Sequence, residues 1–345
     1  MAKASSKNIL ITGGAGFIGA NMTAFYLQKG EAVTILDNFS RPGVYKNVYW
    51  LRKLGGNLSI KFCDVSVDKD ILDYEVEKVD AVIHLAAQVA VTSSVINPRE
   101  DFETNALGTL NVLEAIRKSK NRPPVIYSST NKVYGEMEDV RIKSNKSRHL
   151  FSDFPHGVSE EFQLDFHSPY GCSKGTADQY VRDYARIYGL KTAVFRQSCI
   201  YGPRQFGIED QGWVAWFIIA AVLGRPIVIY GDGKQVRDLL YINDLISLFD
   251  ATFEKIDKVC GEVFNIGGGQ KFTISVWKEF GPLLEKYLEK KIKVKYSDWR
   301  RGDQKVYISD IRKAKRLLNW EPKVGVEEGI SKLFNWVKDN KNLFV

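Results

Sequence analysis

The sequence predicts a doubly wound α/β fold, a parallel sheet with helices on both faces, followed by a smaller mixed α/β lobe. Three observations support this prediction. Apolar runs alternate with helical patterns through the N-terminal part, a glycine-rich turn joins the first run to the first helix, and after Gly202 Gly-Pro and Gly-Arg-Pro steps separate shorter strands. Such a strand–helix–strand rhythm is typical of a parallel sheet.

The expected elements follow in chain order. Strands are expected at Asn8–Thr12, Ala32–Asp37, Ser59–Cys63, Ala81–Leu85 and Val125–Ser128, and helices at Gly16–Lys29 and Thr104–Lys118. Residues 135–168 are polar and irregular, which predicts a long functional loop. Beyond it we expect a buried helix at Trp213–Leu223 and short strands at Ile227–Tyr230, Val263–Ile266 and Ile292–Tyr296. The first domain is therefore expected at residues 7–200 plus about 236–268, and the second lobe at about 201–235 and 269–345.

Composition argues against several classes of protein. The net charge is +8, but the lysines are spread along the chain, so nucleic-acid binding is not expected. The longest apolar stretch, Trp213–Leu223, is shorter than the roughly 20 residues that cross a bilayer, and no secretion signal is visible. Four scattered cysteines and four scattered histidines indicate neither a disulfide framework nor a metal site. A cytoplasmic protein without metal is the expectation.

A glycine-rich turn predicts a dinucleotide site. Gly13, Gly16 and Gly19 follow the first strand and open the first helix, where glycine permits close approach to a pyrophosphate. The second strand ends in Asp37, about 20 residues after the glycine-rich turn. A carboxylate at this separation binds the adenosine ribose hydroxyls in dinucleotide-binding folds. A carboxylate there favours NAD over NADP, although Arg41 partly offsets that preference.

Other residues are expected around the same cofactor. Asp64 follows the third strand and Gln88 follows the fourth, so both lie at the carboxyl edge of the sheet, although turn chemistry alone could also explain such residues. The further residues predicted to contact the cofactor are Phe17, Ile18, Asn38, Ser40, Arg41, Val65, Leu85, Ala86, Ala87, Asn105 and Ser128.

A tyrosine and a lysine form the predicted chemical pair. Tyr170 and Lys174 lie four residues apart at the start of a helix, so their side chains share a face. A neighbouring ammonium stabilises a phenolate and makes the tyrosine a usable base for a sugar hydroxyl. This spacing is common by chance, but the hydroxyl-rich segment Val125-Ile-Tyr-Ser-Ser-Thr-Asn-Lys-Val-Tyr-Gly135 could hydrogen-bond a sugar.

Together these motifs and Arg237-Asp-x-x-Tyr-x-x-Asp244 resemble the extended short-chain dehydrogenase/reductases, which include nucleotide-sugar epimerases and dehydratases. The resemblance implies that Thr130 orients the substrate hydroxyl, that Tyr170 is the acid/base and that Lys174 holds the cofactor ribose. It also implies that Arg237 and Arg300 meet the substrate phosphates, which guanidinium groups fit. The other residues expected to contact substrate are Asn131, Gln197, Cys199 and Gln205.

Two positions and two longer segments of the sequence limit which reaction of this family is expected. Dehydratases of this family carry an Asp-Glu pair after the threonine, whereas this chain has Asn131 and Lys132, which disfavours dehydration. Residues 167–175 and 195–213 resemble the CDP-paratose 2-epimerases (CDP-tyvelose epimerases), including Cys199 where many relatives have Asn. This resemblance implies a CDP-sugar substrate that is epimerised at C2 through a transient 2-keto sugar.

Alternatives remain open at this point. CDP-glucose could replace CDP-paratose, because a largely apolar pocket distinguishes a methyl from a hydroxymethyl group only about a hundredfold. A 4-epimerase of the same family and a non-catalytic NAD-binding sensor are the other hypotheses. The resemblance also implies a homodimer or higher oligomer in which helices 104–118 and 173–188 pair with their copies.

Overall fold

The computed structural model describes residues 6–300 and 302–344. Internal contacts divide the chain into two compact units. Unit 1 comprises Met1–Ser129, Pro169–Phe195 and Ile246–Val263, and unit 2 comprises Thr130–Ser168, Arg196–Leu245 and Phe264–Val345. The predicted boundaries place residues 130–168 and 236–245 in the first domain, whereas the contacts group both segments with unit 2.

The main sheet has seven strands in the order β12-β8-β5-β4-β1-β2-β3. β1 pairs in parallel with β2 and β4, and β3 and β5 extend the sheet in parallel on either side. The predicted parallel α/β sheet is thereby confirmed. The strands are β1 (Asn8–Thr12), β2 (Ala32–Asp37), β3 (Leu58–Phe62), β4 (Ala81–His84), β5 (Val125–Thr130), β8 (Thr192–Gln197) and β12 (Glu262–Ile266).

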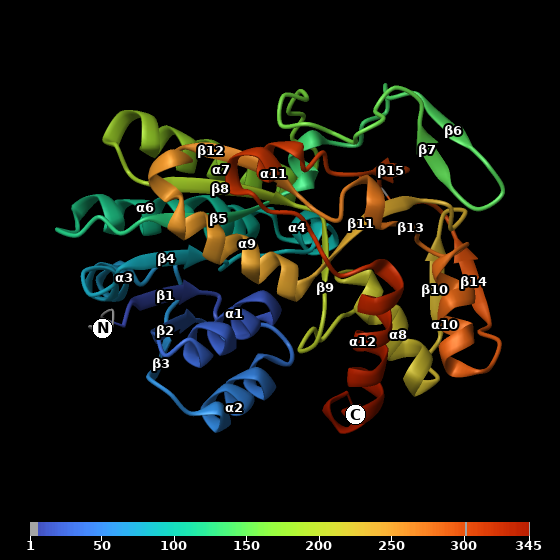
Figure 1. Ribbon diagram of the computed structural model, residues 1–345, viewed down its shortest axis with the longest axis horizontal. Helices are drawn as coiled ribbons and strands as arrows, with labels where there is room; N and C mark the ends of the chain where they lie inside the picture. The colour runs from blue at the N-terminus through green and yellow to red at the C-terminus, as the bar shows by residue number, and fades with distance from the viewer. Residues whose placement is uncertain (1–5, 301, 345) are drawn as a thin grey trace. The chain divides into compact units, whose positions relative to one another are not determined.

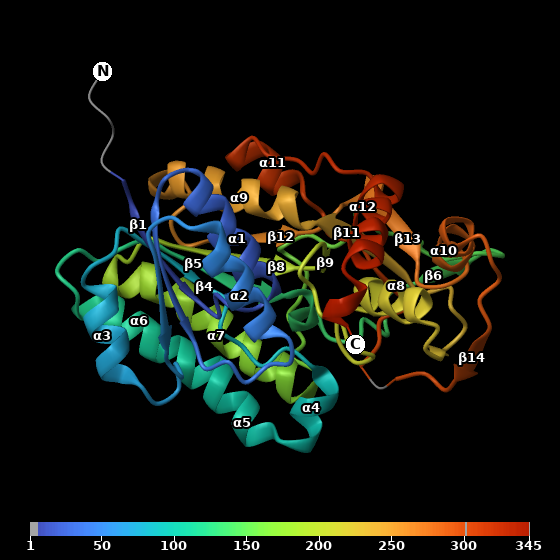
Figure 2. The ribbon, with the colours of Figure 1, turned by 90° about the horizontal axis from the view of Figure 1, so that it is seen from below.

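Helices cover both faces of this sheet. Figures 1 and 2 show α1 and α2 on one face and α3 and α6 on the other. The predicted helix at 104–118 is interrupted, because Glu103–Leu107 forms a π turn before α6 begins. The helices are α1 (Phe17–Gln28), α2 (Val44–Leu54), α3 (Lys69–Val76), α4 (Val91–Ile96), α5 (Pro98–Phe102), α6 (Gly108–Lys118), α7 (Ser168–Tyr188) and α9 (Ile242–Glu254).

The described residues of unit 2 form three small sheets. β11 pairs with β9, β13 and β15, while β10 pairs with β14 and β6 with β7. The strands are β6 (Ile142–Ser144), β7 (His149–Phe151), β9 (Cys199–Tyr201), β10 (Ile227–Tyr230), β11 (Val236–Tyr241), β13 (Thr273–Ser275), β14 (Val294–Ser297) and β15 (Val306–Tyr307). The helices are α8 (Trp213–Leu223), α10 (Phe280–Leu288), α11 (Arg312–Leu318) and α12 (Val326–Asp339). Short 3-10 turns occupy Asn131–Tyr134, Gln270–Phe272 and Lys341–Leu343 in unit 2, and Ile256–Lys258 in unit 1.

The prediction that residues 135–168 are irregular throughout is wrong in one part. β6 and β7 form an antiparallel hairpin there. The Asn145 side chain makes the turn, since its Oδ1 accepts hydrogen bonds from the backbone N–H groups of Ser147 at 2.9 Å and Arg148 at 2.8 Å. A hairpin built on such an Asx turn can form without alternating apolar and polar residues. The sequence pattern therefore did not predict it.

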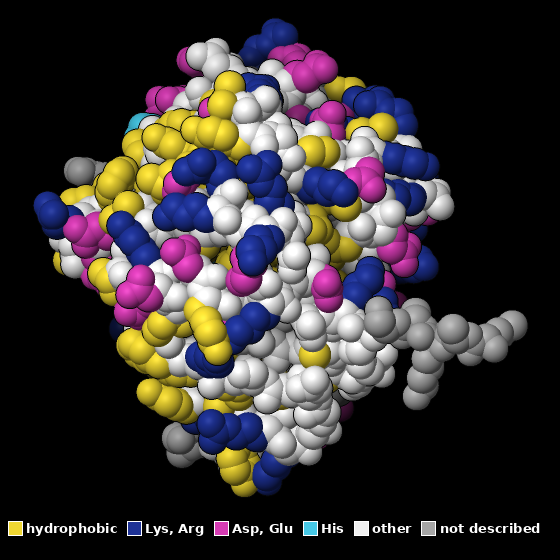
Figure 3. Space-filling view, turned by 90° about the vertical axis from the view of Figure 1, so that its left-hand side faces the viewer, with side chains coloured by type: hydrophobic (Ala, Val, Ile, Leu, Met, Phe, Trp, Pro, Cys, Tyr) yellow, Lys and Arg dark blue, Asp and Glu magenta, His cyan; other side chains and the backbone are white. Residues whose placement is uncertain are grey.

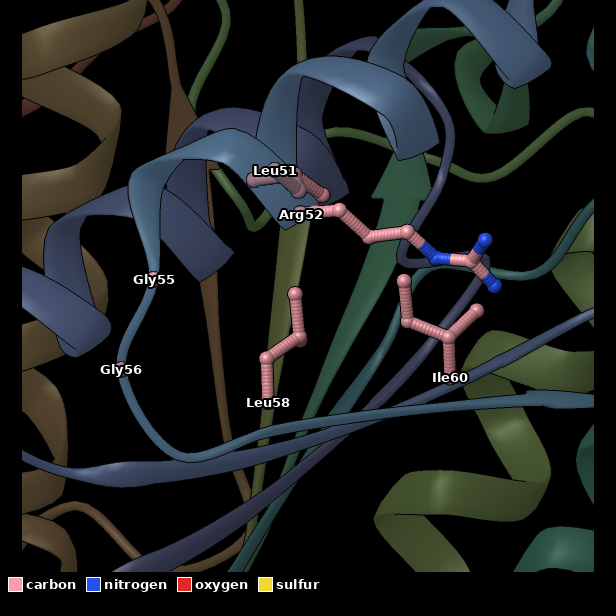
Figure 4. A pocket seen from close by; sticks show the side chains of 6 residues that line it. All are labelled: Leu51, Arg52, Gly55, Gly56, Leu58 and Ile60. Atoms are coloured by element: carbon pink, nitrogen blue, oxygen red, sulfur yellow. The ribbon is translucent and has the colours of Figure 1, made fainter.

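One face of the molecule mixes side-chain types. On the face drawn in Figure 3, hydrophobic, basic and acidic side chains are interspersed. A hollow of about 220 Å³ lies between α2 and β3 and is lined by Leu51, Arg52, Gly55, Gly56, Leu58 and Ile60 (Figure 4). Because it lies at the amino end of β3, it is separate from the carboxyl edge of the sheet, where cofactors bind in such folds. None of the described helices is long and apolar enough to span a membrane.

Candidate active site

The glycine-rich turn is held by contacts that exclude larger side chains. Gly13 has φ of 68°, and a Cβ there would lie 2.7 Å from the backbone N of Ala86. A Cβ on Gly19 would overlap the carbonyl oxygen of Gly13. The helix α1 begins directly after Gly16 with no side-chain cap, so backbone N–H groups at its start are suited to bind an anion.

Replacing Gly13 with alanine is expected to lower the free energy of unfolding by about 2 kcal/mol or more. Both the positive φ and the approach to Ala86 oppose a Cβ at this position. Gly189→Ala is the matched control, because Gly189 has the same φ of 68° but open space around its Cβ position. Urea unfolding of the two variants measures the difference. Equal losses would show that the contact with Ala86 contributes nothing.

Two carboxylates lie at the ends of β2 and β3. The Asp37 oxygens accept hydrogen bonds from the backbone N–H groups of Ala15 at 2.9 Å and Phe39 at 2.8 Å. Burial raises the pKa of Asp37, while those two hydrogen bonds and Arg41 act against the rise. Asp64 accepts a hydrogen bond from Asn38 Nδ2 at 2.9 Å. Although burial opposes it, the pKa of Asp64 is lowered by hydrogen bonds from Ser66 and Asn38. Asp37 therefore lies beside the glycine-rich turn, and its contact with a ribose stays a prediction.

Lys174 is hydrogen-bonded to the backbone of β5 near the carboxyl end of that strand. Its Nζ donates a hydrogen bond to the Ser128 carbonyl oxygen at 2.6 Å and lies 4.3 Å from the centre of the Tyr127 ring. Burial lowers the pKa of Lys174 to about 7, although the charges of Asp101 and Asp178 oppose the shift. Tyr170 lies one turn earlier on α7 and is 8% exposed, with its backbone N–H donating to Ser94 Oγ at 3.2 Å.

In unit 2, the turn after Thr130 is bound to the segment that follows Arg300. Asn131 Nδ2 donates to Gln304 Oε1 at 3.1 Å, and Lys132 Nζ donates to the Gly302 carbonyl oxygen at 2.8 Å. Gln304 Nε2 in turn donates to the Gly135 carbonyl oxygen at 2.7 Å. Asn131 and Lys132 thus hold two chain segments together.

Lys132→Met is expected to release this segment. Loss of the charged hydrogen bond to Gly302, worth about 1.5–3 kcal/mol, should raise the opened population roughly tenfold or more. Limited trypsin digestion then cuts after Arg300 correspondingly faster. Lys143→Met is the control, since Lys143 is an exposed lysine of β6 in the same unit. An unchanged rate of cleavage after Arg300 would contradict the expected role of Lys132.

Both predicted phosphate-binding arginines are paired with carboxylates of unit 2. Arg237 is 7% exposed, and its guanidinium donates to Asp303 Oδ1 at 2.6 Å. The Arg300 guanidinium lies 3.1 Å from Asp210 Oδ1 and 3.9 Å from the centre of the Tyr230 ring. A diphosphate that binds these arginines would therefore have to displace the two carboxylates or share the guanidinium groups with them.

The remaining predicted substrate residues also lie in unit 2. The Nε2 of Gln197 and the Oε1 of Gln205 are buried without a hydrogen-bond partner among the described residues. Cys199 Sγ accepts a hydrogen bond from Trp213 Nε1 at 3.3 Å, and burial raises the pKa of its thiol. Thr130 Oγ1 accepts the backbone N–H of Lys132 at 3.2 Å. Unsatisfied buried amides are uncommon in native proteins, so Gln197 and Gln205 are candidates for polar ligand contacts.

The structure also shows residues that the sequence did not single out. Asp303 pairs with Arg237, and Gln304 joins Asn131 to Gly135. Asp101 lies buried beside the residues that precede Lys174. Within the described residues, no group of three or more His, Cys, Asp or Glu side chains could hold a metal ion.

Comparison with known proteins identifies the family. Residues 10–333 match the sequence profile of the GDP-mannose 4,6 dehydratase family, which covers most of the chain. The chain belongs to this family. GDP-mannose 4,6 dehydratase family proteins are extended short-chain dehydrogenase/reductases, so the resemblance drawn from the sequence motifs is confirmed.

Relatives of the GDP-mannose 4,6 dehydratase family include several epimerases. A CDP-paratose 2-epimerase of Salmonella typhi is 44% identical over 334 residues, which span 95% of this chain and 98% of the relative. The solved UDP-glucose 4-epimerase of Thermotoga maritima, with UDP-glucose, has a TM-score of 0.81 and 32% identity and covers 97% of this chain and 99% of its own. A UDP-glucuronic acid 4-epimerase of Bacillus cereus was solved in complex with UDP-glucuronic acid and NAD. It has a TM-score of 0.81 and 29% identity, and the match covers 96% of this chain and 99% of that chain.

Proposed function

We propose that this protein is an NAD-dependent epimerase that inverts C2 of a CDP-hexose through a transient 2-keto sugar. The substrate pair would be CDP-paratose and CDP-tyvelose, or CDP-glucose and CDP-mannose. The observation that carries the proposal is the buried Lys174, bound to the Ser128 carbonyl one helical turn from Tyr170, in a chain without a dehydratase acid–base pair after Thr130. The likeness to the Salmonella typhi CDP-paratose 2-epimerase supports the C2 position and the cytidine nucleotide.

The residues of unit 1 fit NAD. The glycines let the turn pack closely, because a Cβ on Gly13 or Gly19 would meet backbone atoms, and the uncapped start of α1 suits a pyrophosphate. Each Asp37 oxygen accepts one backbone N–H, which leaves lone pairs for ribose hydroxyls. NAD would supply a reversible hydride acceptor for C2 of the sugar. Asp37 would hold the adenosine ribose and Lys174 the second ribose.

The chemistry of the chain's own residues is proton transfer and orientation. Tyr170 would take the proton of the C2 hydroxyl as the ketone forms, and would return it after the sugar has presented its other face. The ammonium of Lys174 favours the phenolate form of Tyr170 because opposite charge stabilises it. Thr130 would donate a hydrogen bond to the sugar oxygen. No net oxidation results, so one cofactor suffices for repeated turnovers.

Unit 2 would hold the nucleotide part of the substrate. Arg237 and Arg300 offer guanidinium groups for the diphosphate, and Gln197 and Gln205 offer buried amide atoms for polar contacts. Asn131 and Lys132 are bound to Gln304 and Gly302, and an amide and an ammonium cannot supply the acid–base pair for dehydration. We therefore propose epimerisation in preference to 4,6-dehydration.

We also propose that copies of the chain associate through α6 and α7. Helix α7 carries exposed apolar side chains at Tyr180, Ile187 and Tyr188. Exposed apolar groups of this kind on a helix are common where a copy packs.

The direct test is incubation of the purified, NAD-containing protein with CDP-paratose and, separately, with CDP-glucose, without added reductant. Proton NMR follows the configuration at C2. Inversion of CDP-paratose alone supports the narrow epimerase, and inversion of both supports a relaxed pocket at C6. Turnover of neither, together with inversion at C4 of another nucleotide sugar, would replace the proposal with a 4-epimerase. Bound NAD without any turnover would favour the sensor.

A further inference from the structure

Asp101 is a buried carboxylate to which the predicted chemistry assigns no task. It lies on α5 and is 0% exposed. Its Oδ2 accepts a hydrogen bond from Ser173 Oγ at 2.5 Å, and its Oδ1 accepts from Gln88 Nε2 at 3.1 Å and Asn105 Nδ2 at 3.2 Å. Three donors satisfy a charge that would otherwise be costly to bury.

These donors belong to two different parts of unit 1. Gln88 and Asn105 are residues predicted to contact the cofactor, and they also bind each other, because the Gln88 backbone N–H donates to Asn105 Oδ1 at 2.9 Å. Ser173 directly precedes Lys174 on α7, and its hydroxyl lies 3.2 Å from the Tyr170 carbonyl oxygen. Asp101 therefore joins the cofactor side of the site to the helix that carries the chemical pair.

A local irregularity brings these groups together. The π turn Glu103–Leu107 lies between Asp101 and α6 and contains Asn105. Such turns insert an extra residue into a helix and recur at functional sites. Here the turn leaves both Asp101 and Asn105 buried, with Asn105 donating to Asp101 and also to Ser173 Oγ at 3.0 Å.

Asp101 also contributes charge near Lys174. Burial raises the pKa of Asp101, while the hydrogen bond from Ser173 and the charge of Lys174 act against the rise and favour the carboxylate. The ammonium makes its hydrogen bond to the Ser128 carbonyl, a neutral group, so the charges that favour its protonated form come from nearby carboxylates. Burial holds the pKa of His84 at about 3, so His84 is neutral. The titratable groups that face Lys174 are Asp101 on α5, Asp178 and Tyr170 on α7, Tyr127 on β5 and His84 on β4.

We propose that Asp101 is a positioning residue of the epimerase, which anchors Ser173 and α7 to the cofactor-side residues Gln88 and Asn105 and keeps Lys174 in its charged form. This inference rests on the proposed function. It assigns Asp101 two separable tasks, one carried by its hydrogen bonds and one by its charge.

Asp101→Asn tests the charge, because an amide can keep the hydrogen bonds: its oxygen accepts from Gln88 and Asn105, and its NH₂ donates to Ser173 Oγ. Without the carboxylate, the pKa of Lys174 falls below its value of about 7. The ammonium is the active form, so the alkaline limb of the kcat profile should move to lower pH. A shift of about one unit makes kcat roughly tenfold lower near pH 8, about twofold lower near pH 6 and nearly unchanged near pH 5.

Two further variants separate the alternatives. Glu100→Gln removes a carboxylate from the exposed neighbouring position of α5. Because the charge of Glu100 raises the pKa of Asp101, its loss favours the Asp101 carboxylate and should not move the limb to lower pH. Ser173→Ala removes the anchor but keeps the charge, and should lower kcat about tenfold at every pH without moving the limb. An Asp101→Asn profile that coincides with wild type, or one that falls equally at every pH, would overturn the assignment of charge to Asp101.

A measurement without substrate keeps this test distinct from the proposed function. The protein is prepared with lysine isotopically labelled at Cε, and the NMR signal that disappears in Lys174→Arg is followed through a pH titration. The signal should titrate at lower pH in Asp101→Asn than in wild type and in Glu100→Gln. Equal titration points would overturn the inference even if CDP-sugars are epimerised. A shifted titration without sugar turnover would count against the epimerase alone.

Discussion

Replacing Tyr170 with phenylalanine is expected to lower kcat about a thousandfold, within the range that a positioned acid/base contributes. Tyr170 is almost buried and lies one turn before Lys174, whose ammonium is fixed on the Ser128 carbonyl. The phenyl ring keeps the packing of α7 but cannot exchange a proton with the sugar. The variant should therefore still bind NAD and CDP-sugar, which fluorescence quenching and calorimetry measure alongside turnover.

Tyr180→Phe is the matched control for that loss. Tyr180 lies on the same helix but is 45% exposed. Its hydroxyl points to a different face of α7 than the predicted pair, and phenylalanine keeps the apolar ring that is proposed to pack against a copy. The kcat of Tyr180→Phe should therefore be unchanged. Full turnover in Tyr170→Phe would remove Tyr170 as the base, and an equal loss in both variants would indicate damage to α7.

Replacing Arg237 with methionine is expected to raise KM for the CDP-sugar about a hundredfold with a smaller change in kcat. Two charge-assisted hydrogen bonds to a phosphate contribute about 3 kcal/mol, and methionine supplies none. Arg237 is nearly buried, so water cannot replace the guanidinium easily. Initial rates over a range of substrate concentrations separate KM from kcat.

Asp303→Asn distinguishes phosphate binding from structural support. If Arg237 serves only as the partner of Asp303, loss of either residue should damage the enzyme alike. If Arg237 binds phosphate, Asp303→Asn frees the guanidinium from a competing carboxylate, and KM should stay the same or fall. A hundredfold rise in KM for both variants would contradict the phosphate contact.

The sequence was sufficient for the parallel sheet because its signals are local. Asn8–Thr12 and Ala32–Asp37 are apolar runs whose limits the structure reproduces, and the glycines between them mark the turn. Trp213–Leu223 is likewise a helix with the predicted bounds, because Gly212 and Gly224 both adopt positive φ at its ends. Strong periodicity and glycine punctuation carry such predictions.

Other features depend on contacts between distant segments and left no local signal. Asp101 and Ser173 are 72 residues apart, and nothing in either segment indicates their hydrogen bond. The pairing of Arg237 with Asp303 joins residues 66 apart. The motif resemblance predicts that Arg237 and Arg300 bind phosphate, but only the structure shows that both guanidinium groups are paired with carboxylates. The roles proposed for Thr130, Tyr170 and Lys174 stay predictions until the variants are measured.

The order of the strands in the main sheet has a consequence for biosynthesis. β8 neighbours β12 in the sheet, yet β12 ends at Ile266, long after β8 ends at Gln197. While the intervening residues are translated, the edge of the fully buried β8 lacks its partner, and unpaired edges of apolar strands promote aggregation. A nascent or truncated chain that stops before Glu262 should therefore depend on chaperones, whereas the finished chain should not.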